Sequence, residues 1–147
     1  MSKDFLSDME TFFMALADKT RLRLLNLLRE DEICVCFFTE VLGESQPKIS
    51  RHLAYLRNAG VVEARRDGKW MHYRIVTPQD PFAAEVLEDT LRWLASQTAM
   101  QRDYQNLAAA CCAPAAPVTI MRAPKPDTFV ETNMNYSQKE ELETYLL

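Results

Sequence analysis

The chain has 147 residues, of which 48% are hydrophobic and 26% are charged. At roughly 150 residues per domain, this length predicts one compact domain. The composition excludes a disordered polyelectrolyte, and no uncharged apolar run approaches the roughly 20 residues that a membrane-spanning helix needs. We therefore expect a cytoplasmic protein.

The formal net charge of −4 hides a segregation of charge along the chain. Residues 46–76 carry seven Lys and Arg against two Asp and Glu, whereas residues 1–45 carry five against nine. The segments 77–112 and 113–147 are also net negative. A basic block in an acidic chain is typical of a surface that contacts phosphates, so the distribution predicts a nucleic-acid partner.

Two helices are predicted at the start of the chain. Apolar residues at helical spacing indicate an amphipathic helix over Phe5 to Leu16, whose apolar face needs another surface to cover it. Asp18 is a suitable N-cap for a second helix over Lys19 to Arg29. Its five leucines leave little polar face, as expected of a central core helix.

The next two helices form a helix-turn-helix pattern. A short helix is expected over Val35 to Leu42, ending at Gly43, because glycine commonly terminates helices. Ser45 can cap a further helix over Gln46 to Asn58, which ends at Gly60. Two helices joined by a short turn containing glycine are the hallmark of this motif.

A change of period follows. Residues 61–66 and 69–76 flank Asp67-Gly68, and in the second stretch Met71, Tyr73 and Ile75 alternate with polar residues, which predicts a β-hairpin with Asp67-Gly68 in its turn. From Pro81 helical spacing returns, and no Gly or Pro interrupts it before Cys112. Such a helix reaches roughly 45 Å, more than one small domain can cover.

This length, together with the apolar stripe of the first helix, predicts a symmetric homodimer. We expect residues 1–112 to form the folded domain. Residues 113–147 begin with a proline-rich stretch, which predicts a flexible C-terminal tail.

Three stretches carry a family resemblance: ALADKTRLRLLNLL (15–28), EICVCFFTEVLGESQPKISRHLAYLRNAGVV (32–62) and RRDGKWMHYRI (65–75). In these the chain resembles the ArsR/SmtB family of winged helix-turn-helix metalloregulators, over residues 8–107 in all. The resemblance implies a mainly α fold with a small β-hairpin, dimeric through the N-terminal and long C-terminal helices. It also implies a repressor that binds double-stranded operator DNA and leaves it when an inducer binds.

The resemblance places the inducer site at Glu32-Ile33-Cys34-Val35-Cys36, because in the family a Cys-x-Cys pair at the start of the third helix supplies thiolate ligands. The chain departs from the arsenic-sensing pattern at Thr39, where many members have a third cysteine. Zinc-sensing members use Asp and His on the long helix. Here both histidines, His52 and His72, lie in the DNA-binding half, which argues against zinc.

Thiolates favour soft or borderline ions such as As(III), Sb(III), Cd(II) and Pb(II). In a regular helix Cys34 and Cys36 point about 200° apart, so they cannot grip one ion. Either the helix begins after Cys36, or ligand binding unwinds its first turn. Distortion of this helix would displace the recognition helix packed on it and couple inducer binding to DNA affinity.

Cys111 and Cys112 end the predicted long helix. They can complete the inducer site, within the subunit or across the dimer, form a second site, or be small core residues. Three thiolates suit As(III), four suit Cd(II), and a vicinal pair suits a trivalent methylated arsenical. A thiol redox switch requires a lowered thiol pKa, which the acidic neighbours Glu30, Asp31 and Glu32 do not favour.

The DNA-reading residues are predicted from position and chemistry. Residues near the start of a recognition helix lie closest to base edges, and basic residues at a wing tip reach phosphates or the minor groove. The recognition-helix candidates are Gln46, Lys48, Ser50, Arg51 and His52, and the wing candidates are Arg65, Arg66 and Lys69.

Three hypotheses for the function follow. The first is a repressor that As(III) or Sb(III) releases from DNA, with no permanent cofactor. The second keeps the repressor and changes the inducer to Cd(II), Pb(II) or a methylated arsenical. The third is a thiol redox protein or enzyme, which the lack of a C-x-x-C motif and of a Gly-rich phosphate loop disfavours, since the chain has only three glycines.

Overall fold

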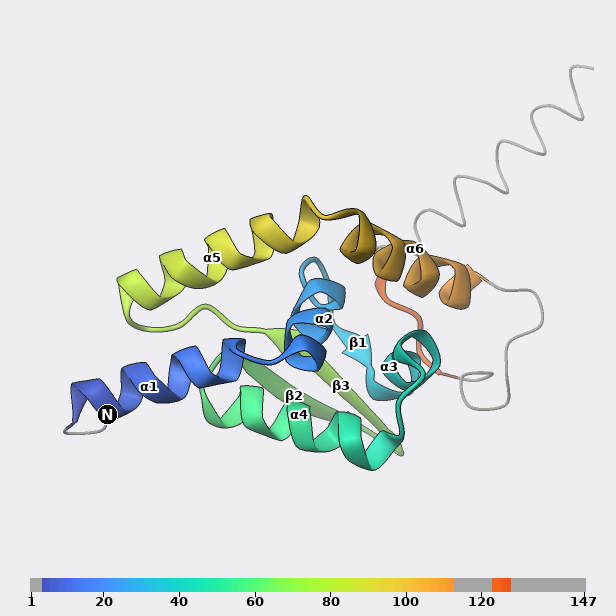
Figure 1. The fold of residues 1–147 in the computed structure, drawn as a ribbon. Coiled ribbons are helices and arrows are strands. Elements are labelled where there is room, and N and C mark those ends of the chain that lie inside the picture. The colour runs from blue at the N-terminus through green and yellow to red at the C-terminus, as the bar shows by residue number, and fades with distance from the viewer. Residues whose placement is uncertain (1–3, 113–122, 128–147) are drawn as a thin grey trace, which may run out of the picture.

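The computed structural model describes residues 4–112 and 123–127. Its elements are, in chain order, α1 (Phe5–Leu16), α2 (Lys19–Leu27), β1 (Ile33–Cys34), α3 (Val35–Leu42), α4 (Gln46–Asn58), β2 (Val62–Asp67), β3 (Trp70–Ile75), α5 (Pro81–Ala95) and α6 (Thr98–Cys112). Helix α2 lies at the centre, between α4 on one side and the α5–α6 arm on the other (Figure 1). The fold is mainly helical with one small sheet, as the sequence predicts.

Local capping chemistry sets the helix boundaries. The carboxylate of Asp18 accepts a hydrogen bond from the Arg21 N–H at the start of α2, and the Ser45 hydroxyl accepts one from the Lys48 N–H at the start of α4. Helix α3 ends at Gly43, whose φ of 66° is a left-handed conformation that favours glycine. These predicted caps are confirmed.

The core forms where α2, α3 and α4 meet. Leu24 and Leu25 of α2 are fully buried, and so is Phe38 of α3. Helix α4 turns Ile49, Leu53 and Leu56 to the same core, which leaves its other face to solvent. This packing fixes α4 against α2 and α3.

The sheet has three antiparallel strands in the order β1-β3-β2, where the sequence predicts only a hairpin. Strand β1 adds the pairs Ile33–Tyr73 and Cys34–His72 to one edge of the hairpin. A strand of two residues is too short to show an alternating pattern, and its pairing is about 40 residues away along the chain. The sequence therefore gave no local signal for it.

The hairpin turn is one residue later than predicted. Asp67 pairs with Trp70, so the two-residue turn is Gly68-Lys69 and Asp67 is the last residue of β2. Gly68 has a φ of 58°, and no described non-glycine residue has a positive φ. A glycine at the first turn position followed by a residue of negative φ is typical of a type II′ turn, whose twist suits a hairpin.

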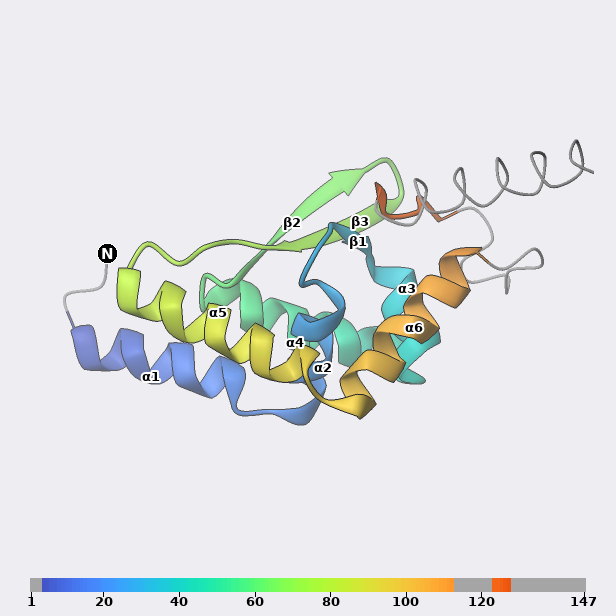
Figure 2. The same ribbon diagram turned by 90° about the horizontal axis from the view of Figure 1, so that it is seen from above.

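The prediction of one unbroken helix from Pro81 to Cys112 is wrong. Helix α5 ends at Ala95, and the Ser96 hydroxyl donates to the carbonyl oxygen of Trp93 over 2.6 Å. Such side-chain bonds compete with the helical ladder, so the Ser96-Gln97 step is a weak point. Figures 1 and 2 show that the chain bends here and that α6 runs over α2 towards α3.

Tertiary contacts of α6 stabilise this bend. The Arg23 guanidinium donates to both carboxylate oxygens of Asp103, over 2.7 and 3.0 Å, and the Asn26 amide donates to the Met100 carbonyl over 2.9 Å. Leu107 is completely buried. A straight helix would place these groups beyond the domain, so the packing of α6 on α2 and α3 outweighs the continuous helical pattern.

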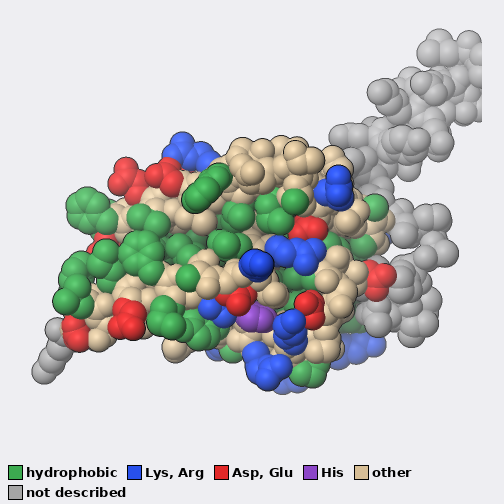
Figure 3. All heavy atoms as spheres, viewed as in Figure 1, with side chains coloured by type: hydrophobic (Ala, Val, Ile, Leu, Met, Phe, Trp, Pro, Cys, Tyr) green, Lys and Arg blue, Asp and Glu red, His purple; other side chains and the backbone are tan. Residues whose placement is uncertain are grey.

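Helices α1 and α5 leave a broad apolar face uncovered in the single chain. Figure 3 shows hydrophobic side chains gathered over these two helices. The large hydrophobic residues among them that are at least 43% exposed are Phe5, Leu6, Met9, Phe13 and Met14 of α1, and Phe82 and Trp93 of α5. The predicted uncovered stripe of the first helix is therefore present, and it continues onto α5.

The predicted C-terminal tail, residues 113–147, falls mostly outside the described residues. Of the described part, Ala123 is 8% exposed and packs against the core. Within residues 4–112 and 123–127 no helix combines the length and apolarity needed to cross a membrane.

Candidate sensor site and nucleic-acid interface

Cys34 and Cys36 lie at the junction of β1 and α3, with their sulfur atoms 3.1 Å apart. Cys34 is extended, with φ −68° and ψ 136°, and precedes the helix, whereas Cys36 is in its first turn. The expectation that α3 begins after Cys36 is wrong, because the helix begins between the two thiols. The extended residue removes the 200° separation, so the sulfurs meet without unwinding of α3.

The spacing of the two sulfurs is close to that of a shared ion. A metal with bonds of about 2.3 Å to sulfur holds two tetrahedral thiolates roughly 3.8 Å apart. A small separation of the sulfurs brings them to that distance. Cys34 is fully buried and Cys36 is half-buried, and they do not form a disulfide. The backbone at the start of α3 thus brings the two thiols side by side.

The hydrogen bond between the thiols splits their pKa values. Donation by Cys36 lowers the pKa of Cys34 from 9.0 to about 7, against the effect of burial, and the same bond raises the pKa of Cys36. The acidic neighbours of the motif do not keep the pKa of Cys34 high, contrary to the sequence expectation. A thiolate ligand is therefore available near neutral pH.

We expect the thiolate absorbance of the protein to rise with a midpoint near pH 7, because Cys34 ionises there. Cys34→Ser removes this transition, and Cys36→Ala moves it to higher pH because the donor is lost. The folded pKa is below the ordinary value of 9.0, so the thiolate stabilises the fold above pH 9 and this contribution is lost towards pH 7. Ultraviolet titration checks the prediction, and a transition that survives in Cys34→Ser contradicts it.

Within residues 4–112 and 123–127, no third metal ligand lies beside this pair. Thr39 is one turn along α3. Its hydroxyl donates to the Cys36 carbonyl over 2.8 Å, so it is bonded to the backbone of its own helix. Cys111 is buried in α6, which packs on α3, and the side chain of Cys112 lies outside the described part. Among the described residues no group of three or more Cys, His, Asp or Glu is close enough to hold a metal ion.

The predicted recognition helix presents its N-terminal half to solvent. Gln46 and Arg51 are exposed, while Lys48 and Ser50 are half-buried. The Lys48 ammonium is 3.0 Å from a carboxylate oxygen of Glu44. These four side chains lie along one helix that is anchored through its apolar face, which is the arrangement needed to enter a groove.

His52 contacts the protein itself. Its Nδ1 is 3.3 Å from a guanidinium nitrogen of Arg21 and 3.7 Å from a carboxylate oxygen of Asp18. The Arg21 guanidinium also stacks on the Tyr55 ring, 4.2 Å from its centroid. His52 and Tyr55 therefore attach α4 to the start of α2. Sequence reasoning missed Arg21, because a basic residue on a leucine-rich helix has no pattern that names its partner.

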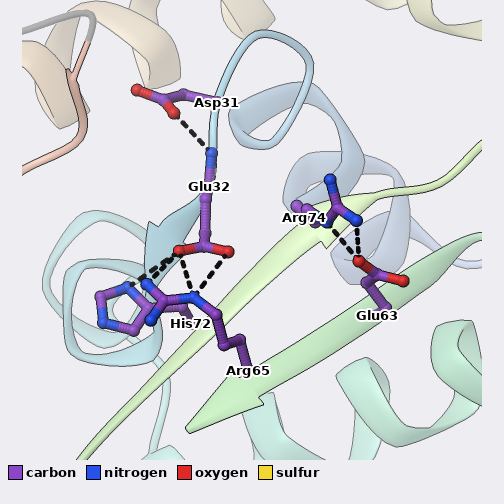
Figure 4. A network of polar contacts seen from close by, with 6 residues as sticks. All are labelled: Asp31, Glu32, Glu63, Arg65, His72 and Arg74. Atoms are coloured by element: carbon purple, nitrogen blue, oxygen red, sulfur yellow. Dashed lines mark hydrogen bonds and ion pairs between the residues drawn. The ribbon is translucent and has the colours of Figure 1, made fainter. Parts of the chain in front are cut away.

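The three wing residues Arg65, Arg66 and Lys69 are exposed on the hairpin. The Lys69 ammonium lies 5.0 Å from the centroid of the Trp70 ring. Arg65 bonds to Glu32, whose other neighbour is the buried ring of His72 (Figure 4).

Sequence reasoning also missed the contacts of Glu32 with Arg65 and His72, because strand β1, which directly follows Glu32, was not predicted. The Arg65 hydrogen bonds hold the pKa of the Glu32 carboxyl below its usual value. The carboxylate is therefore charged at neutral pH. His72 Nε2 is buried, with no hydrogen-bond partner among the described residues.

Comparison with known proteins agrees with this architecture. Residues 18–64, which span α2 to β2, match the family described as bacterial regulatory protein, arsR family. The solved transcriptional repressor BigR from Xylella fastidiosa superposes with a TM-score of 0.53 at 28% identity, covering 63% of this chain and 89% of that one. The three-stranded sheet with its helix-turn-helix is thus a winged helix-turn-helix.

Curated relatives extend the match beyond the motif. The chain is 44% identical over 101 residues to the arsenical resistance operon repressor of Escherichia coli, covering 68% of this chain and 85% of the relative. It is 48% identical over 87 residues to the arsenic resistance transcriptional regulator ArsR1 of Pseudomonas putida, covering 56% and 68%. The chain belongs to the ArsR family of DNA-binding transcriptional repressors, which are not enzymes.

Proposed function

We propose that this protein is an operator-binding repressor that trivalent arsenic or antimony releases from DNA by binding the thiolates of Cys34 and Cys36. The supporting observation is the 3.1 Å approach of the two sulfurs at the point where β1 becomes α3, the first helix of the helix-turn-helix. Soft thiolates favour these ions. The two curated relatives are, by name, arsenic-resistance regulators, which favours the same inducers.

The release mechanism follows from the packing. Ligation separates the two sulfurs, which moves the end of β1 relative to the first turn of α3. Helix α3 packs on α4, so the displacement reaches the recognition helix. A ligand shifts an equilibrium between two arrangements only by the difference between its affinities for them. Here the inducer favours the arrangement in which the two thiolates are separated enough to bind one ion.

As(III) takes three thiolates, so a third donor completes this site. Cys111 and Cys112 are the further thiols of the chain, and α6 packs on α3, which favours a ligand from this end of α6. Other inducers remain as alternatives. Cd(II) and Pb(II) are also thiophilic, with four thiolates suiting Cd(II), and two thiolates suit a trivalent methylated arsenical. A thiol redox switch at Cys34 and Cys36 is the more distant alternative, favoured by the lowered pKa of Cys34.

The same proposal assigns DNA contact to α4 and to the wing. Gln46, Lys48, Ser50 and Arg51 face the major groove with base edges or phosphates as partners. His52 contributes by holding α4 in place, through its contact with Arg21 of α2. The wing residues Arg65, Arg66 and Lys69 contact phosphates or the minor groove.

Arg51→Ala is expected to weaken operator binding by about 5- to 150-fold, the cost of one lost base or phosphate contact. The number of arsenite ions bound per subunit stays unchanged, because Arg51 is exposed on α4 and remote from the thiols in the chain. Fluorescence anisotropy with labelled operator measures the first quantity and equilibrium dialysis the second. Unchanged DNA affinity would contradict the placement of α4 in the groove.

We also propose a homodimer, formed through the apolar face of α1 and α5. Seven large hydrophobic side chains of these helices are at least 43% exposed, more than isolated surface residues require. The length of the single helix predicted over 81–112 also favoured a dimer in the sequence analysis. That length does not support the dimer, because α5 and α6 are separate helices. A second copy provides the matching apolar face, and twofold symmetry places two recognition helices on one operator.

The decisive experiment is an anisotropy titration of DNA from upstream of the protein's own gene, under reducing conditions, repeated with arsenite, antimonite, cadmium and zinc. Salt-sensitive binding that arsenite or antimonite reverses is the expected result. Reversal by cadmium alone would indicate that the inducer is an ion bound by four thiolates. Reversal by a disulfide-forming oxidant alone would favour the redox switch, and no binding at low salt would refute the repressor.

A further inference from the structure

The guanidinium of Arg65, on the wing, donates hydrogen bonds to the carboxylate of Glu32, the residue directly before β1. Its Nε lies 3.0 and 3.3 Å from the two carboxylate oxygens of Glu32, and one of its terminal nitrogens is 2.5 Å from Oε1. In Figure 4 dashed lines join the Glu32 carboxylate to both Arg65 and His72, so the side chain of this residue, which directly precedes β1, contacts both strands of the hairpin. The guanidinium thus presents its two-donor edge to Glu32.

The sensor thiol and this arginine belong to one row across the sheet. Cys34 pairs with His72, and His72 pairs with Arg65, so the three residues are direct cross-strand neighbours. Glu32 is two residues before Cys34, and its Oε1 is 3.8 Å from His72 Nδ1. A movement of Cys34 therefore changes the position of the Glu32 carboxylate, and with it the strength of the Glu32–Arg65 pair.

A phosphate and Glu32 compete for the same donors. The edge formed by Nε and a terminal nitrogen is the one that binds carboxylates and phosphates through two parallel hydrogen bonds. The Arg65 side chain is 55% exposed, so a phosphate can approach it. While both donors point at Glu32, this edge of the Arg65 guanidinium is not available to a phosphate.

We propose that Glu32 is the positioning residue that connects the thiol pair to the wing, by taking Arg65 away from the DNA backbone when the inducer is bound. In the DNA-bound arrangement Arg65 turns from Glu32 to a phosphate. In the inducer-bound arrangement the shifted β1 keeps the Glu32–Arg65 pair closed. The inference rests on the proposed function and adds a second route, through the sheet, to the one through α3 and α4.

The chain contains a matched control for the carboxylate. Glu63 of β2 pairs with Arg74 of β3 on the same sheet, and both side chains are exposed (Figure 4). Glu63→Gln removes one negative charge and one arginine partner, as Glu32→Gln does. It leaves the link between Cys34 and Arg65 intact. The difference between the two variants therefore isolates that link from the general effect of charge on DNA affinity.

The experiment measures operator affinity with and without arsenite for the wild type, Glu32→Gln, Glu63→Gln, Arg65→Ala and the double variant Glu32→Gln/Arg65→Ala. Glu32→Gln is expected to raise operator affinity by about two- to fivefold over Glu63→Gln, the range of a partly exposed ion pair. It also weakens the arsenite effect by a similar factor. In the Arg65→Ala background Glu32→Gln raises operator affinity by no more than Glu63→Gln does in the wild type, because the link runs through Arg65.

Salt dependence provides a readout that a merely structural role does not move. With arsenite bound, Arg65 is free to contact a phosphate only where Glu32 has been replaced, so the slope of log affinity against log salt is steeper by about 0.9 in Glu32→Gln than in Glu63→Gln. If arsenite releases the wild type while the two glutamine variants behave alike, the inference is overturned and the proposed function stands. If arsenite does not release the wild type, both are overturned.

Discussion

Replacing Cys34 and Cys36 together by serine is expected to leave operator affinity within about twofold of the wild type and to abolish the response to arsenite. An inducer that binds a distant site typically changes affinity by about 5- to 150-fold, and here the whole factor disappears. The physical reason is that serine oxygen is a hard donor, which does not replace a thiolate towards As(III). Anisotropy titrations with and without arsenite measure both quantities.

Thr39→Ser is a suitable control, because it changes the same helix and keeps the hydroxyl that bonds to the Cys36 carbonyl. It should respond to arsenite as the wild type does. The buried position of Cys34 makes a thermal unfolding curve of the double variant necessary. If a folded Cys34→Ser/Cys36→Ser protein still leaves the operator with arsenite, the sensor lies elsewhere and the cysteines at the end of α6 become the leading site.

Placing a charge on the apolar face of α1 and α5 is expected to have an effect of similar size on DNA binding itself. Trp93→Glu, at a side chain that is 73% exposed, buries an uncompensated carboxylate only if the dimer forms. The protein should therefore become monomeric and lose the linkage of two half-sites, which reduces operator affinity by roughly 100-fold or more. Light scattering coupled to size-exclusion chromatography and anisotropy measure the two effects.

Gln105→Glu is the matched control, because it adds the same charge at an exposed position of α6, away from that face. It should remain dimeric and bind the operator. The fold of the monomer is expected to survive in Trp93→Glu, since the side chain lies outside the core. A dimer that persists in Trp93→Glu would contradict the assignment of this face.

Local patterns in the sequence are enough to predict the four helices of the N-terminal half and the helix-turn-helix. Their signals are local: Asp18 and Ser45 cap helices, and Gly43 ends one in a left-handed conformation. The thiol motif was also found from the sequence, through the family resemblance that the Cys-x-Cys pair carries. Interactions within a few residues along the chain are fixed by residue type and spacing, so pattern analysis finds them.

The tertiary structure alone decided how these parts are connected. The pairing of Ile33 and Cys34 with β3 makes these two residues a strand, which holds Cys34 extended beside Cys36 and places the preceding residue, Glu32, next to Arg65. The break between α5 and α6 follows from the docking of α6 on α2, which a continuous apolar pattern conceals. Each of these features depends on partners far apart in sequence, whose energies no local periodicity encodes.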